Sequence, residues 1–131
     1  MFDKYVIWGD AIHNVRKDGM VAGFEFGVRI SYYRGLRLSM VEDFRISIDG
    51  EPVARADIRF TVRGREYCLD EMETEYDDRW EFAEVARIFV HRPGGLLPGR
   101  RYRLDVEELL RVSYSQDLSA SFCSKQRVVA A

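Results

Sequence analysis

Two histidines, His13 and His91, are candidates for acid–base chemistry, because histidine is the residue type that most often moves protons near neutral pH. A general base or a metal site also needs acidic or further histidine partners at a defined spacing, and no such motif surrounds either histidine. Ser39, Ser113 and Cys68 are possible nucleophiles, but none lies in a motif such as a glycine-flanked serine elbow. We therefore expect surface or edge roles for the histidines and no catalytic residue in this chain.

The acidic segment 70–78 is the best candidate for binding a hard cation, because carboxylate oxygens suit calcium and magnesium. Its spacing lacks the central glycine of a calcium loop, so we favour a solvated loop, with a docking surface for a basic partner as the next interpretation. Cys68 and Cys123 lie far apart and match neither a zinc motif nor a redox pair, so we expect reduced structural thiols and no metal site.

Aromatic residues adjoin arginine in two segments that look like loops or strand ends. The first is Tyr32-Tyr33-Arg34-Gly35, and the second is Asp78-Arg79-Trp80. Aromatic and arginine side chains dominate protein interfaces, because they give a large buried area at modest entropy cost. The opposing interpretation is that Tyr33 and Trp80 cap the hydrophobic core. The candidate contact residues are thus Tyr32, Tyr33, Arg34, Arg79 and Trp80.

The elements that would hold these side chains are read from alternating apolar and polar residues, which is the pattern of a half-buried strand. Residues 23–31, 44–48 and 58–62 show this alternation. Asp49-Gly50 and Arg63-Gly64-Arg65 follow the second and third runs and favour tight turns with positive φ. We expect a strand ending at Asp49-Gly50 and a hairpin over residues 58–69.

Further strands are expected in the second half of the chain. Residues 86–91 are rich in β-formers, and alternation resumes at 102–106 after a glycine- and proline-rich connection at 92–99. That connection is expected to close a second hairpin or to cross between sheets. A last strand is expected over 121–129.

Residues 106–112 fit a helical face as well as a strand. We favour a strand, because Leu110, Val112 and Tyr114 continue the phase of the preceding alternation. Glu108 breaks this phase, which we interpret as a bulge or an edge of the sheet.

Many short strands and no amphipathic helix of ten or more residues predict an all-β fold, a single-domain antiparallel β-sandwich over residues 1–131. The composition is that of a globular domain, with 47% hydrophobic and 13% aromatic residues. Because 22 acidic and 20 basic residues are spread along the chain, no basic stripe predicts a nucleic-acid partner. With no basic leader and no apolar run of about 18 residues, we expect no membrane association and a cytoplasmic location.

Several of these segments, taken together, resemble the small β subunit of bacterial C-glycoside deglycosidases. The resemblance covers most of residues 1 to about 115, whereas residues 115–131 carry nothing specific to the family. It is carried by Ile30–Leu36, Ser39–Asp43, Asp70–Glu73, Asp78–Phe82 and Pro93–Leu96.

This resemblance implies an accessory subunit of a two-component, cytoplasmic carbon–carbon lyase. The large α subunit would be a TIM-barrel protein similar to sugar isomerases, with a histidine base and a divalent metal, for which manganese is expected. The complex would cleave the C–C bond between a 3-oxo sugar and an aromatic aglycone of flavonoid type. The β subunit would be required for a working complex but would hold no cofactor, and the aromatic–arginine segments would contact the α subunit or shape its substrate entrance.

Two alternatives stay open from the sequence. The chain fits a free-standing carbohydrate-binding module that stacks sugars on Tyr33 and Trp80, and it fits an enzyme of its own with a metal held by residues 70–78. The aglycone, the number of copies in the complex and the contact of any residue with substrate are left open.

Overall fold

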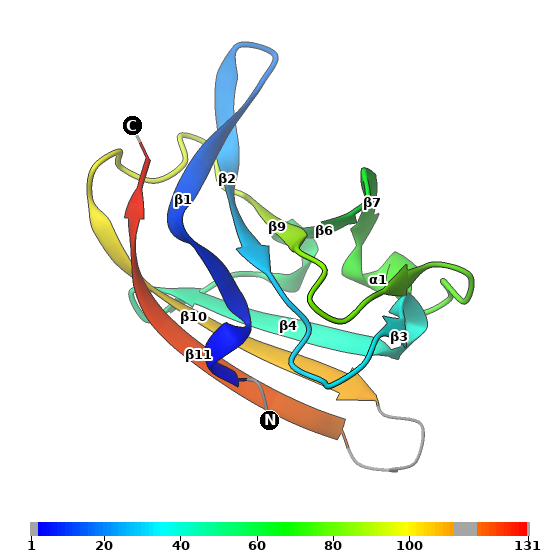
Figure 1. Cartoon of the computed structure of the whole chain (residues 1–131). Helices are drawn as coiled ribbons and strands as arrows, with labels where there is room; N and C mark the ends of the chain where they lie inside the picture. The colour runs from blue at the N-terminus through cyan, green and yellow to red at the C-terminus, as the bar shows by residue number, and fades with distance from the viewer. Residues whose placement is uncertain (1–2, 112–117, 131) are drawn as a thin grey trace.

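The computed structural model describes residues 3–111 and 118–130 and is built almost entirely of strands (Figure 1). One four-residue helix, α1 (Leu69–Met72), and three short 3₁₀ turns, η1 (Asp3–Tyr5), η2 (Leu38–Met40) and η3 (Arg55–Asp57), complete the described part. The strands are β1 (Ile7–Lys17), β2 (Met20–Val28), β3 (Leu36–Arg37), β4 (Val41–Ile48), β5 (Glu51–Pro52), β6 (Ile58–Val62), β7 (Arg65–Cys68), β8 (Arg79–Trp80), β9 (Ala86–His91), β10 (Arg101–Arg111) and β11 (Leu118–Val129). The all-β prediction is confirmed.

Nine strands form one continuous sheet in the order β5-β4-β10-β11-β1-β2-β9-β6-β7, and β3 pairs with β8 in a second, two-stranded sheet. The large sheet curls over, so that β4, β10 and β11 form one layer and β2, β9 and β6 lie across from it (Figure 1). Among the described strand pairs, β1 with β11 is parallel and the others are antiparallel. The two layers of the sandwich are therefore halves of one sheet, joined by β1.

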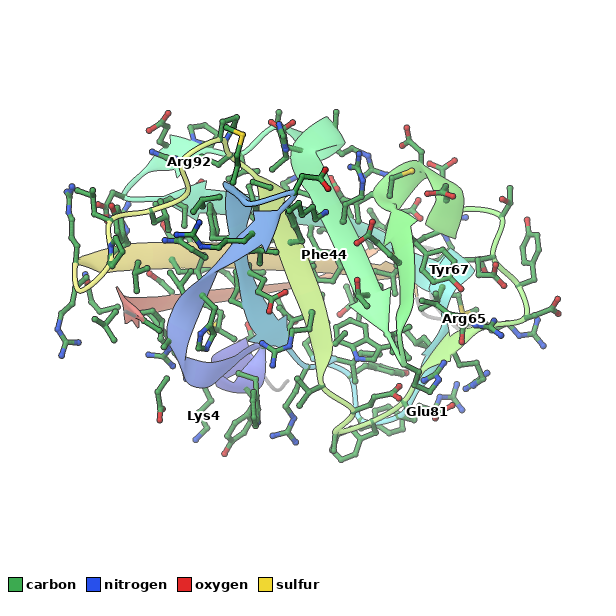
Figure 2. The ribbon with its side chains drawn as sticks, turned by 90° about the horizontal axis from the view of Figure 1, so that it is seen from above. Lys4, Phe44, Arg65, Tyr67, Glu81 and Arg92 are labelled. Atoms are coloured by element: carbon green, nitrogen blue, oxygen red, sulfur yellow. The ribbon has the colours of Figure 1, made fainter. Side chains whose placement is uncertain are left out.

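The core fills the space between the layers, because alternate residues of each strand point inward. In β4 the inward residues are Phe44, Ile46 and Ile48, all nearly inaccessible to solvent. In Figure 2, Phe44 lies near the centre of the molecule, whereas Tyr67 and Glu81 lie toward one end and Arg92 toward the other. Phe44 and Phe60 stack across the layers with ring centroids 5.8 Å apart.

The expected turns are present. Asp49 and Gly50 have φ values of 49° and 83°, and Arg63 and Gly64 have φ values of 48° and 78°, which are the paired positive values of a tight two-residue hairpin. The connection 92–99 crosses between layers, since β9 and β10 lie on different halves of the sheet. The final strand also forms, beginning three residues earlier than expected, at Leu118.

The position of Glu108 differs from the one predicted from the sequence. Glu108 is neither at an edge nor at a bulge: it lies inside β10, opposite Phe44 of β4 and Ser121 of β11, and its exposed fraction is 0%. The register shift falls one step later, between Leu109 and Leu110. The phase is therefore unbroken and simply buries a carboxyl group. Val112, Ser113 and Tyr114, on which other predictions rest, lie outside the described residues.

Candidate functional site

The short pair β3–β8 brings the two aromatic–arginine segments together from distant parts of the sequence. Leu36 lies opposite Trp80 and Arg37 lies opposite Arg79. The Leu38 amide donates to the Asp78 carbonyl at 3.0 Å, which extends the pairing beyond the two strands. At Gly35 the backbones approach so closely that an added Cβ would lie 2.9 Å from the Trp80 carbonyl oxygen. Glycine is required there by the contact.

Adjacent residues of a strand point to opposite faces, and β8 separates its two candidate residues in this way. Trp80 points into the core with an exposed fraction of 0%, and its ring contacts Phe60 at 5.2 Å and Phe44 at 6.0 Å between centroids. Its indole N–H donates to the Glu84 carbonyl at 2.9 Å. Trp80 therefore does not fit the prediction of a contact residue: it anchors β8 to the core, as the core-capping interpretation required.

Tyr32 and Tyr33 differ in the same way, with one ring buried in the core and the other exposed at the surface. Tyr32 is buried at 6% exposure, whereas Tyr33 is exposed at 47%, and their ring centroids lie 4.4 Å apart. The Arg34 guanidinium lies over the Tyr33 ring at 5.8 Å. Tyr33 and Arg34 thus remain available at the surface, and Tyr32 supports the ring of Tyr33 from below.

Arg79 faces outward and, together with Arg34, lines a hollow in the surface. This arginine hollow has a volume of about 260 Å³ and is lined by Arg34, Gly35, Leu36, Arg37, Met40 and Arg79. Arg79 donates through Nε to Glu81 at 2.9 Å and through a terminal nitrogen to the Gly35 carbonyl at 3.2 Å. Arg37 was not singled out from the sequence, because its place in the hollow arises from the pairing of β3 with β8.

A partly buried ionic network around Arg63 and Asp78 fixes the backbone just before Arg79. Asp78, at 8% exposure, accepts hydrogen bonds from the Tyr67 hydroxyl at 2.7 Å and the Arg79 amide at 2.9 Å, and it forms an ion pair with Arg63. Burial would raise the pKa of Asp78, but these donors outweigh it and hold that pKa below its usual value. Arg63 also binds Glu84 at 2.6 Å, so one guanidinium ties together both ends of the 78–84 segment.

Most residues of the 70–78 segment are exposed, as predicted for a solvated loop, but Met72 and Asp78 are buried. Leu69 and Met72 are buried on α1, and Asp78 belongs to the network around Arg63. Glu71 accepts from the Cys68 amide at 2.8 Å, which caps the helix. Throughout the described ranges no three histidine, cysteine, aspartate or glutamate side chains are grouped so that they could hold a metal ion. These contacts are suited to holding the 69–78 segment in a fixed conformation.

The remaining reactive side chains are dispersed. His13 and His91 are exposed on β1 and β9, as expected for surface positions. Cys68 and Cys123 are free cysteines, the first half-buried and the second buried.

Glu108 is the unexpected polar group of the core. Its Oε1 accepts from the Ser31 amide at 2.8 Å, whereas Oε2 accepts no hydrogen bond from the part of the chain that the structure describes. Burial raises the pKa of Glu108 to about 7, even though the Ser31 donors act in the opposite direction. The nearby carboxylate of Asp3 raises it further. No sequence signal pointed to this group beyond the apparent break in alternation.

A second exposed aromatic group, made of Tyr5 and Phe82, was not singled out as a contact candidate from the sequence. Tyr5, at 48% exposure, and Phe82, also at 48%, line a small cavity of about 130 Å³ with Arg29 and Ile30. Because these residues come from η1, the segment that follows β2 and the β8–β9 loop, no local motif joins them. Their contact depends on how the sheet curls.

Comparison with known proteins places the chain among deglycosidase subunits. A family model described as "C-glycoside deglycosidase beta subunit" matches residues 2–114. The C-glycoside deglycosidase beta subunit of Eubacterium cellulosolvens is 33% identical over 98 residues, which are 74% of this chain and 67% of that protein. The 3'-dehydrocarminate deglycosidase beta subunit of a Microbacterium species is 30% identical over 101 residues, 75% of each chain. In the described residues no helix is long and apolar enough to cross a membrane.

Proposed function

The chain belongs to the C-glycoside deglycosidase beta subunit family, and from this premise we propose that it is the non-catalytic β subunit of a two-component enzyme that cleaves 3-oxo-C-glycosides. The observation that carries the proposal is the extent of the family match, residues 2–114, which includes β1 to β10 and the whole arginine hollow. The match therefore covers the frame and the candidate contact surface together.

The proposed partner is a cytoplasmic TIM-barrel α subunit with a histidine base and a divalent metal, manganese. In that subunit a base removes the proton next to the sugar ketone, the electrons of the resulting enolate expel the aglycone with cleavage of the C–C bond, and the aglycone takes up a proton. The metal would supply positive charge for the ketone oxygen. This chain contributes neither the base nor the metal ligands in the proposal.

The contribution assigned to this chain is a rigid surface that binds the α subunit near its substrate entrance. Support comes from the exposed Tyr33 ring and from Arg34 and Arg79, which line one hollow on a backbone fixed by Arg63 and Asp78. Residues presented on a fixed backbone lose little entropy on binding, so they suit a permanent interface. Trp80 has a positioning role in this proposal, since it holds β8 from inside the core.

Co-expression with a C-glycoside deglycosidase α subunit tests the proposal. We expect a stable heteromer that releases aglycone from a flavonoid 3-oxo-C-glucoside, and we expect the α subunit alone to be inactive or much slower. Equal activity from the α subunit alone, or no complex on size-exclusion chromatography, would contradict the proposal.

The carbohydrate-binding alternative loses one of its two platforms, because Trp80 is inaccessible. Calorimetry of the isolated chain against C- and O-glucosides tests what remains of it. Saturable binding of a sugar at Tyr33 would favour the alternative over the accessory role.

A further inference from the structure

The arginine hollow contains one guanidinium group, that of Arg37, which the described part of the chain does not neutralise. Arg37 and Arg79 lie directly opposite each other on β3 and β8, and like charges in such a pair destabilise it. Arg79 is paired with Glu81, but within residues 3–111 and 118–130 the Arg37 side chain forms no hydrogen bond or ion pair. The pairing of these two strands therefore places two guanidinium groups side by side, and among the described residues the carboxylate paired with them is that of Glu81, which binds Arg79.

A carboxylate is the group that best fits this arrangement. Guanidinium groups bind carboxylates through two parallel N–H donors, and an acid between Arg37 and Arg79 would turn a repulsive cross-strand pair into an attractive triad. The Glu81 carboxylate is committed to Arg79 at 2.9 Å. Leu36 and Met40 supply apolar wall to the hollow, which suits the methylene stem of an acidic side chain.

We propose that the arginine hollow receives an aspartate or glutamate side chain of the partner subunit, with Arg37 as its principal ligand. This inference rests on the proposed function and adds the chemistry of the contact. A partner's side chain fits better than a free anion, because a free carboxylate in an open hollow competes with water and salt, whereas a side chain within an interface is delivered at high effective concentration. The exposed Tyr33, beside Arg34, gives that interface an aromatic contact next to the charged one.

The backbone under the hollow is rigid, which the binding of a single side chain requires. Gly35 allows β3 to contact β8, Trp80 anchors β8 in the core, and Arg63 holds the Asp78 carboxylate behind it. The guanidinium groups are therefore presented from fixed positions.

The test compares Arg37→Gln with Arg101→Gln in the complex with a C-glycoside deglycosidase α subunit. Arg101 is also exposed but lies at the far end of β10 from β3, so it serves as the matched control. We expect Arg37→Gln to weaken the complex about fivefold at low salt and to flatten its salt dependence, and Arg101→Gln to change neither. The isolated Arg37→Gln chain should be at least as stable to urea as the unsubstituted chain, because a repulsive pair is removed.

Each result decides the inference. Weaker binding combined with undiminished stability of the isolated chain supports it, since a merely structural role would lower both. Unchanged affinity of Arg37→Gln at every salt concentration overturns the inference while leaving the β-subunit role intact, and failure of the unsubstituted chain to form a complex overturns both. Saturable millimolar or tighter binding of benzoate to the isolated chain, lost in Arg37→Gln, would assign the hollow to a free anion instead.

Discussion

Replacing Glu108 with glutamine should remove a large part of the pH dependence of folding stability. In the folded protein burial raises the pKa of Glu108 to about 7, whereas an exposed glutamate in the unfolded chain has a value near 4.5. Below 4.5 the group is protonated in both states and does not alter the balance. As the pH rises from 4.5 to about 7, the unfolded chain loses the proton while the folded chain keeps it, so stability falls over this window and levels off above it.

The size of the effect follows from the separation of the two pKa values. At about 1.4 kcal/mol for each pH unit between them, the folded protein loses roughly 3 kcal/mol between pH 4.5 and pH 7. This is a sizeable share of the roughly 5–15 kcal/mol by which such a domain is stable. Glutamine keeps an acceptor oxygen for the Ser31 amide but does not ionise, so this contribution is absent from Glu108→Gln.

Urea unfolding curves for both proteins at several pH values between 4.5 and 8 measure the effect, with tryptophan fluorescence reporting on the buried Trp80. Because all other titrating groups are shared, including Asp3 nearby, they largely cancel in the difference between the two proteins. Glu107→Gln is the matched control, since Glu107 is the preceding residue and pairs with Arg45 at 3.2 Å on the outer face. Parallel stability curves for Glu108→Gln and the unsubstituted protein would refute the reasoning.

Three further predictions concern the frame of the site. Trp80→Ala should destabilise the protein by about 4 kcal/mol, because it empties the space that the indole ring fills against Phe44 and Phe60. A loss below about 1 kcal/mol in urea denaturation followed by circular dichroism would contradict the burial of Trp80, and Trp8→Ala, at a position 45% exposed, is the control. Asp78→Asn should lower the free energy of unfolding by about 2 kcal/mol at pH 7. Because the pKa of Asp78 is lowered in the folded protein, this difference should shrink as the pH falls below about 4. A constant difference in stability across an acid titration would argue against the ion pair. Gly35→Ala should push β3 away from β8 at a cost of about 1–3 kcal/mol, visible as shifted amide resonances in both strands, and unchanged resonances there would contradict the close contact.

The sequence predicted most of the long strands, because one face of each is buried. It did not predict β1, whose buried positions do not alternate regularly. Phe44, Ile46 and Ile48 alternate with polar residues because the core buries one face of the strand. The Asp49-Gly50 turn is readable because its positive φ values favour these two residue types. Such features depend on near neighbours in the chain, so they can be predicted from the sequence without knowledge of the fold.

The candidate site was harder to predict from the sequence, because it depends on contacts between distant segments. β3 and β8 are two residues long, too short to show a period, so the sequence could not decide that Arg79 points out and Trp80 points in. Arg37 gains its significance only from lying opposite Arg79. Glu108 looked like an interruption, because a fully buried carboxyl group is rare and alternation alone assigns polar residues to the surface.

The parallel contact between β1 and β11 has a consequence for the biosynthesis of this protein. Ala11 pairs with Val128, so an early strand of this fold waits for one that is made more than a hundred residues later. Until β11 leaves the ribosome, the facing edges of β1 and β10 remain unpaired, and open strand edges promote aggregation. Slower elongation would lengthen the time for which these edges stay open, so it should lower the yield of folded protein.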